Sequence, residues 1–190
     1  MKLYHFPVGP SLAARIALRE AGLEAETIEV DFAMRTAGDG RPFAEISPKG
    51  YVPALVLDDG AVLTENVAIL DWIAQQSPAL RPADAMERSR LIEMLAFLST
   101  EIHKPFLSLL FMPGEEAKPL LREIISSRFA FLGEGLKADY LLGDRFSTAD
   151  AMLYVMLSGE RLPGIEVPEI FDAYVRRIGA RPAVREALAA

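Results

Sequence analysis

The most specific local pattern in the chain is SPKGYVPALVLDDG, in which Pro53 directly precedes an apolar run. A proline cannot donate a ladder hydrogen bond, so it belongs at the first residue of a strand or on a sheet edge. If the Val52–Pro53 bond is cis, the main-chain groups of Val52 turn outward. They can then pair with an extended, peptide-like ligand as a neighbouring strand would. The alternative is a trans proline that only begins a strand.

A second pattern able to bind a ligand is LTENVAILDWIA, where Glu65 and Asn66 stand at the start of a helical repeat. The first turn of a helix has unpaired N–H groups and a dipole that favours anions. Such an end can bind a ligand carboxylate, while Glu65 can pair with a ligand ammonium. The alternative is structural, with Glu65 as a first-turn acid and Thr64 as the helix cap.

Short strands and helices alternate up to about residue 76, and they must position both patterns. Strands are predicted at residues 2–6, at 26–32 with Ile28, Val30 and Phe32 on one face, and on both sides of Asp59-Gly60. Helical spacing follows Ser11, a natural N-cap, and stops at Gly22; it returns at ENVAILDWIAQQ. Residues 33–50 are loop-rich, with about one helical turn. The predicted order is β-α-β, a looped segment and β-β-α.

The rest of the chain is predicted to be helical. Apolar residues three and four positions apart mark two core-facing helices: Leu91, Leu95, Leu98 and Ile102, then Leu121, Ile125, Phe129, Leu132 and Leu136. The first should break near Pro105, which also disfavours helical geometry at Lys104. Ser147 and Asp150 have capping-box spacing before a third helix, and shorter helices are expected at 168–178 and 182–189.

Composition argues against several classes of function. Lys plus Arg number 20 and Asp plus Glu 27, a net charge of −7, so nucleic acid is not an expected partner. No apolar run approaches the ~18 residues of a membrane span, and MKLYHFPVGP does not resemble a signal peptide. A cytoplasmic protein is therefore expected. The chain has no cysteine and 2 histidines, so disulfides and a metal site are not expected.

Together, the order of elements, the Val-Pro and Glu-Asn pairs and the all-α remainder resemble a cytosolic glutathione transferase. The resemblance covers nearly the whole chain and is closest to the bacterial beta class. There, MKLYHFPVGPSLAARIALREAG, SPKGYVPALVLDDG and LTENVAILDWIA have near-identical counterparts, and STEIHKPF and FSTADAMLYVML match the helical domain. The resemblance implies a thioredoxin-like domain at 1–77, a linker at 78–84, an all-helical domain at 85–190 and a homodimer.

The resemblance implies that glutathione is the co-substrate and lies in a cradle on the first domain. The main chain of Val52, beside a cis Pro53, would pair with the cysteinyl part. Glu65 and Asn66 would hold the γ-glutamyl end. Arg35 falls where the class often has a lysine near the glycyl carboxylate, and arginine can keep that ion pair.

Residues of the helical domain would complete the site. The resemblance places Thr100 to His103 at the cleft, that of the partner subunit in a dimer, and makes Thr100 a glutathione contact and His103 a catalytic candidate. The alternative for His103 is a surface group on an amphipathic helix. Phe106, Leu110 and Phe111 are candidate walls for an electrophile, with core packing as the alternative for each.

The chain departs from the class at Pro10, where beta-class enzymes carry a cysteine. Proline has no side-chain donor and no N–H, so it cannot hydrogen-bond to sulfur. By analogy with the serine and tyrosine classes, we expect Ser11 to donate its hydroxyl proton to the glutathione thiolate, aided by the helix dipole. The rivals are His5, where the class tends to have a tyrosine, and Tyr4, whose position suggests packing.

The expected function is conjugation of glutathione to a small hydrophobic electrophile. Because the chain has no cysteine, thiol–disulfide exchange through a mixed disulfide with the enzyme is disfavoured. One alternative is a non-catalytic binding or interaction protein that has kept the fold, since fold alone does not establish function. Another is a glutathione-dependent isomerase or peroxidase that uses the same cradle.

Overall fold

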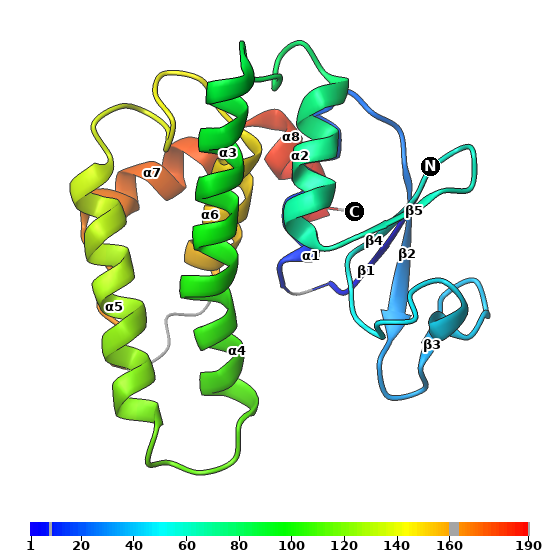
Figure 1. The fold of residues 1–190 in the computed structure, drawn as a ribbon, viewed down its shortest axis with the longest axis horizontal. Helices are drawn as coiled ribbons and strands as arrows, with labels where there is room; N and C mark the ends of the chain where they lie inside the picture. Colours follow the sequence, from blue (N-terminus) through cyan, green and yellow to red (C-terminus); the bar gives the residue numbers. More distant parts are fainter. Residues whose placement is uncertain (8, 160–163, 190) are drawn as a thin grey trace.

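The computed structural model describes residues 1–7, 9–159 and 164–189. A mixed β-sheet with two covering helices forms the first part of the fold, and helices form the rest (Figure 1). Helices α1 and α2 lie between the sheet and the long α3–α5 helices (Figure 1). The predicted fold class, a thioredoxin-like α/β unit followed by an all-α unit, is confirmed. None of the described helices combines the length and apolar character needed to cross a membrane.

The sheet has five strands in the order β3-β2-β1-β4-β5. Their bounds are β1 Lys2–His5, β2 Glu26–Asp31, β3 Thr36–Ala37, β4 Ala54–Val56 and β5 Val62–Thr64. β1 and β2 run parallel, because α1 crosses between them, while the other pairs are antiparallel. The hairpin at Asp59-Gly60 is confirmed, with Gly60 at φ 87°. β3 was not predicted, since two residues are too short to show a period.

The end of β2 corrects one prediction. Phe32 was expected on the buried face of the strand, yet it is 42% exposed. The strand ends at Asp31, whose carboxylate accepts hydrogen bonds from the backbone N–H groups of Ala33 and Met34 at 2.8 and 3.0 Å. This local turn takes the chain out of the sheet before Phe32 can reach the core.

The two faces of the sheet lead to different cores. Leu3 belongs to the large core that continues through α1 and α2 into the helical part. Tyr4, on the opposite face, packs in a smaller core with Ile28, Val30, Ala37, Phe43, Ile46 and Ala54. The alternation of β1 therefore places adjacent residues in separate environments.

Helices α1 and α2 begin near one another, at the end of the sheet where the candidate ligand-binding residues lie. α1 spans Ser11–Ala21 and stops at Gly22, which has φ 67° as predicted. The prediction of Ser11 as the N-cap is wrong: Ser11 is the first helical residue, and Pro10 precedes it without a side-chain cap. α2 spans Asn66–Gln76, directly after Glu65.

The helical part comprises α3 Ala85–Phe97, the π-helical segment η2 Leu98–His103, α4 Lys104–Phe111, α5 Lys118–Gly135, α6 Thr148–Ser158, α7 Ile170–Gly179 and α8 Pro182–Ala189. The predicted stripe through Leu91, Leu95, Leu98 and Ile102 is fully buried. In the second stripe, Ile125, Phe129, Leu132 and Leu136 are buried and Leu121 is partly buried against the same core.

The predicted break at Pro105 is wrong. Lys104 keeps helical geometry at φ −63° and ψ −47°, and Pro105 lies in the first turn of α4. The missing N–H of a proline costs little in a first turn. The π-helical segment ends at His103, immediately before α4. The chain therefore changes from π-helical to α-helical geometry at this point and stays helical.

The capping box at α6 is confirmed, and it is tied to the buried core. Asp150 is fully buried and accepts hydrogen bonds from the Ser147 and Leu141 amides, the Ser147 hydroxyl and the Tyr174 hydroxyl, all at 2.7–2.8 Å. One carboxylate therefore joins the start of α6 to α7 and to the preceding loop.

We expect Asp150→Ala to lower the free energy of unfolding by about 3–4 kcal/mol, because it leaves buried donors unpaired. Urea unfolding followed by circular dichroism measures this change. Asp144→Ala, at an exposed aspartate of the same segment, is the matched control and should stay within about 0.5 kcal/mol. Equal losses in both variants would contradict the structural role of Asp150.

Candidate functional site

The Val52–Pro53 peptide bond is cis, which confirms that prediction and rules out the trans alternative. Pro53 is buried and stands just before β4, which begins at Ala54 beside Tyr4 of β1. Among the hydrogen bonds of the described residues, none uses the main-chain amide or carbonyl of Val52. The segment just before β4 therefore offers main-chain groups to an extended ligand.

Glu65 adopts a conformation that non-glycine residues rarely take. Its φ is 72°, and it joins β5 to α2. Such a residue costs on the order of 1–3 kcal/mol, and strain of this kind concentrates at functional sites. Both parts of the structural alternative are wrong: Thr64 is the last residue of β5 rather than the cap, and the first turn of α2 contains no acidic residue.

The Glu65 carboxylate is already paired within the chain. Its Oε1 accepts hydrogen bonds from Lys49 Nζ and from the Tyr51 hydroxyl, both at 2.6 Å. The hydrogen bond from Lys49, then that from Tyr51, holds the pKa of Glu65 below its usual range. The ammonium of Lys49 thus contacts the Glu65 carboxylate, which was predicted to bind the ammonium of a ligand. Lys49 and Tyr51 were not predicted, although both lie in the SPKGYVP pattern.

Asn66 links the two helix starts. Its Nδ2 donates to the Pro10 carbonyl oxygen at 3.0 Å, while its Oδ1 is buried and has no partner among the described residues. A buried acceptor without a donor costs about 1–3 kcal/mol. The amide is therefore arranged to receive one more hydrogen bond at the junction of α1 and α2.

Ser11 does not offer its proton to a ligand in this structure. Its side chain is fully buried; the hydroxyl donates to the Phe6 carbonyl at 2.9 Å and accepts from the Phe6 amide at 3.1 Å. The prediction that the Ser11 hydroxyl proton is available to a ligand is therefore wrong for this structure. The main chain of Phe6 pairs with both the donor and the acceptor function of that hydroxyl. Ser11 instead closes the turn between β1 and α1.

The two rival residues lie on opposite faces of the sheet. His5 is buried beside α1, where burial first and the Arg15 guanidinium second hold its pKa below the usual value, and its Nδ1 has no described partner. Tyr4 faces the small core and donates its hydroxyl proton to Asp39 Oδ2 at 2.9 Å. Tyr4 is thus a packing residue, as predicted, with a polar partner that was not.

His103 ends the π-helical segment, and π-helical turns are frequent at functional sites. Its Nε2 is buried without a described partner, and burial lowers its pKa to about 4. The ring is therefore neutral at pH 7, and the surface-group alternative does not describe it. The next residue, Lys104, places its ammonium 5.9 Å from the centre of the Tyr51 ring. This contact brings the start of α4 to the Lys49–Tyr51–Glu65 cluster.

Five other predicted residues are not brought into this cluster by any described contact. Thr100 is exposed and donates to the Ala96 carbonyl at 3.1 Å. Arg35 is exposed in the turn after β2, at φ 56°. Phe106 packs partly against the main core, whereas Leu110 and Phe111 are 50% and 77% exposed on α4.

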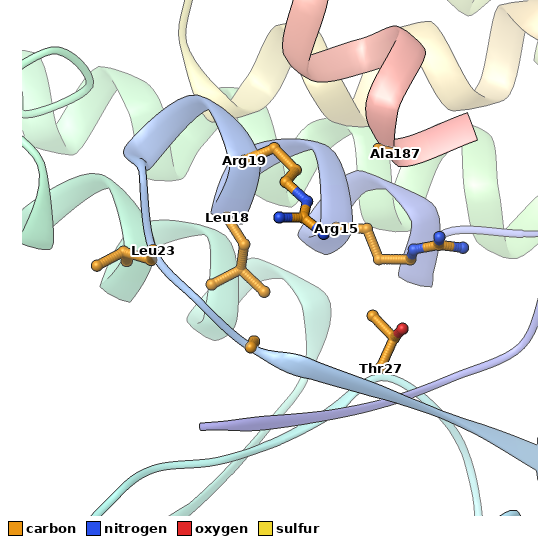
Figure 2. A pocket seen from close by; sticks show the side chains of 7 residues that line it. Arg15, Leu18, Arg19, Leu23, Thr27 and Ala187 are labelled. Carbon is orange, nitrogen blue, oxygen red and sulfur yellow. The ribbon is translucent and has the colours of Figure 1, made fainter. Parts of the chain in front are cut away.

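Two surface hollows lie away from the predicted residues. Figure 2 shows one between α1, β2 and α8, with Arg15, Arg19 and Thr27 on its walls; at about 20 Å³ it suits only something of the size of a water molecule. The other, about 470 Å³, lies between the start of α3 and residues 142–147. The predicted ligand residues line neither hollow, and the candidate site remains the end of the sheet at Val52, Glu65 and Asn66.

Comparison with known proteins finds similarity along the whole chain. Residues 11–76 match the family model "Glutathione S-transferase, N-terminal domain", and residues 100–190 match "Glutathione S-transferase, C-terminal domain". The chain is 37% identical over 198 residues to glutathione S-transferase GstA of Escherichia coli O157:H7, covering 100% of this chain and 98% of the relative.

Two further relatives differ in the activity or ligand that they are named for. A maleylacetoacetate isomerase of Pseudomonas aeruginosa is 30% identical, with 98% of this chain and 95% of the relative covered. The solved structure of a sphingomonad glutathione S-transferase complexed with glutathione has a TM-score of 0.90 and 40% identity, covering 100% of this chain and 98% of that one.

The structural role of Ser11 leads to a stability prediction. Ser11→Ala should lower the free energy of unfolding by about 1–3 kcal/mol, since it leaves the Phe6 amide without its acceptor. Ser127→Ala, which removes an exposed hydroxyl that donates to the Ile124 carbonyl, is the control and should be close to neutral. Urea unfolding curves that coincide for Ser11→Ala and wild type would contradict this role.

Proposed function

Because this chain belongs to the glutathione S-transferase family, we propose that it binds glutathione as a thiolate and joins its sulfur to a small hydrophobic electrophile. The observation that carries the proposal is the arrangement at the end of the sheet where β4 begins and β5 stops: the main chain of Val52 and the Oδ1 of Asn66, which have no partner among the described residues, and the strained Glu65. These are acceptors and main-chain groups suited to a peptide with an ammonium at one end.

In this proposal, the tripeptide lies along the segment just before β4, at the end of the sheet. Its cysteinyl main chain pairs with Val52, and its γ-glutamyl ammonium bonds to Glu65 and Asn66 Oδ1. Lys49 then moves off Glu65 or shares the carboxylate, since the described contacts leave Oε2 for a second donor. The γ-glutamyl carboxylate meets the start of α2, and Arg35 pairs with the glycyl carboxylate.

The reactive sulfur belongs to the ligand, because the chain has no cysteine. A thiol with a pKa of ~8.5 must be lowered by about two pH units, or roughly 2.7 kcal/mol, to be mostly ionised at pH 7. The start of α1 contributes about 0.3–1 kcal/mol through its dipole. One hydrogen bond to the anion supplies about 1.5–3 kcal/mol. We assign it to His103, whose Nε2 has no partner among the described residues and whose neighbour Lys104 contacts Tyr51, rather than to Ser11, whose proton goes to the Phe6 carbonyl.

The helical part provides the electrophile site and the contact between subunits in this proposal. Large apolar side chains remain exposed on its helices, among them Met86 at 65% and Phe131 at 60%. Single exposed apolar residues also occur on monomers, so the expectation of a homodimer, with Thr100 near the partner's cleft, rests on the family. Phe106, Leu110 and Phe111 remain the candidate walls for the electrophile.

A second candidate is a glutathione-dependent isomerase, which the similarity to a maleylacetoacetate isomerase favours. It would use the same thiolate, added to a double bond and later eliminated, so glutathione is regenerated. Turnover of a cis-alkene diacid without consumption of glutathione distinguishes this activity from conjugation. Calorimetry that detects no glutathione binding at millimolar concentration would favour the non-catalytic alternative.

Glu65→Gln should weaken glutathione binding by about 10–100-fold, because a charge-assisted hydrogen bond is lost. Titration calorimetry measures the affinity, and Glu134→Gln, at an exposed glutamate of α5, is the control. Since hydrogen bonds from Lys49 and Tyr51 hold the pKa of Glu65 below its usual range, the ratio of wild-type to Glu65→Gln affinity should be constant from pH 8 to 5 and shrink only in stronger acid, as the carboxylate becomes protonated. The ratio removes the pH dependence that ionisation of the glutathione thiol adds to both proteins. An unchanged affinity in Glu65→Gln would reject the cradle.

His103→Ala should raise the pKa of the bound glutathione thiol by about one to two pH units, the effect of one lost hydrogen bond to an anion. Thiolate absorbance of the bound ligand, titrated from pH 5 to 10, gives this value. His103→Gln, which can still donate, should restore part of the effect. If Ser11→Ala raises the thiol pKa and His103→Ala does not, the serine hypothesis holds instead.

A further inference from the structure

Tyr4 carries a hydroxyl in a place where packing alone would accept phenylalanine. It is fully buried in the middle of β1, and its ring lies 6.2 Å from that of Phe43. The hydroxyl donates to Asp39 Oδ2 at 2.9 Å and accepts a hydrogen bond from the Arg41 guanidinium. A buried tyrosine hydroxyl with both functions used serves to fix its partners.

Both partners come from the loop between β3 and η1 Phe43–Glu45. Arg41 donates to Asp39 Oδ2 through Nε at 3.0 Å and Nη2 at 2.8 Å, and Arg41 holds the pKa of Asp39 below its ordinary value. The Arg41 side chain is 49% exposed, so this ion pair alone stabilises the loop little. The Tyr4 hydroxyl adds a connection from the pair to the rigid centre of the sheet.

The same loop fixes the backbone of Arg35. The Arg35 carbonyl accepts from the Phe43 amide at 3.0 Å, and the Ala37 amide donates to the Arg41 carbonyl at 2.9 Å. Arg35 has a φ of 56°, which an arginine keeps only when its surroundings hold it. Two residues provide these surroundings, and both contact Tyr4. Phe43 bonds to the Arg35 carbonyl and its ring lies beside the Tyr4 ring, and Arg41 bonds to Ala37 and to the Tyr4 hydroxyl.

We propose that Tyr4 is a positioning residue: its hydroxyl, through Asp39 and Arg41, holds the loop so that Arg35 is ready for the carboxylate at the glycyl end of the ligand. This rests on the proposed function, in which Arg35 binds that carboxylate. The contribution of Tyr4 is therefore specific to one end of the tripeptide and absent at the γ-glutamyl end.

The test compares glutathione with γ-glutamylcysteine, which lacks the glycyl residue. Tyr4→Phe keeps the ring and removes the hydroxyl. It should weaken glutathione binding by about five- to tenfold, the effect of one hydrogen bond, and leave γ-glutamylcysteine binding unchanged. Tyr140→Phe, which removes a hydroxyl that accepts from Arg181 Nη1 at 3.0 Å in the helical part, is the control and should alter neither affinity.

Arg35→Ala and the double variant complete the cycle. If Tyr4 acts through Arg35, the double variant binds glutathione no more weakly than Arg35→Ala alone. Asp39→Asn breaks the same network from the loop side and should reproduce the selective loss, so the test does not depend on the folding of one variant. The inference is overturned if Tyr4→Phe weakens both ligands equally or neither, while Arg35→Ala still weakens glutathione selectively. Failure of wild type to bind glutathione would instead reject the proposed function.

Discussion

The hydrogen bonds that hold two helix starts at one end of β1 are the constraint on which the site depends. Ser11 bonds to both main-chain groups of Phe6, and Asn66 bonds to the Pro10 carbonyl. These contacts hold the positive ends of α1 and α2 close to one another. In the proposed function, anionic groups of the ligand lie at these helix starts, and its ammonium meets the Glu65 carboxylate and the Asn66 Oδ1.

The fold could be predicted from the sequence wherever buried residues recur at a regular spacing or a turn has a local signal. The stripe from Leu91 to Ile102, the Gly22 stop and the Asp59-Gly60 hairpin are all in place, because each depends on local geometry or on one apolar face. The errors come from side chains that compete with the local pattern. Asp31 turns the chain before Phe32, and the π-helical segment accommodates Pro105 within a continuing helix.

The site could be predicted in part, since its main-chain features have recognisable sequences and its side-chain pairings do not. Val52-Pro53 and Glu65-Asn66 were identified from their positions beside a strand and a helix. The partners of those residues come from other segments: Lys49 with Glu65, Asn66 with Pro10, Asp39 with Tyr4. The regular spacing of residues in one sequence does not show which donor from a distant segment will reach a given acceptor. For Ser11, the residue type was right for a hydroxyl donor, but the main chain of Phe6 receives the proton.

The proline at position 10 changes what the site can do, and the structure shows why the change is tolerated. Pro10 contributes its carbonyl, which accepts from Asn66 Nδ2 and from the Ala13 amide at 3.1 Å, and neither bond needs a side chain at that position. The geometry at the start of α1 therefore persists without a thiol. The chain has no cysteine for mixed disulfides, while the cis Val52–Pro53 bond and the dipole of α1 are both present. In the proposed function, the sulfur of the ligand therefore carries out conjugation or isomerisation, because the chain has no cysteine for redox exchange through a mixed disulfide.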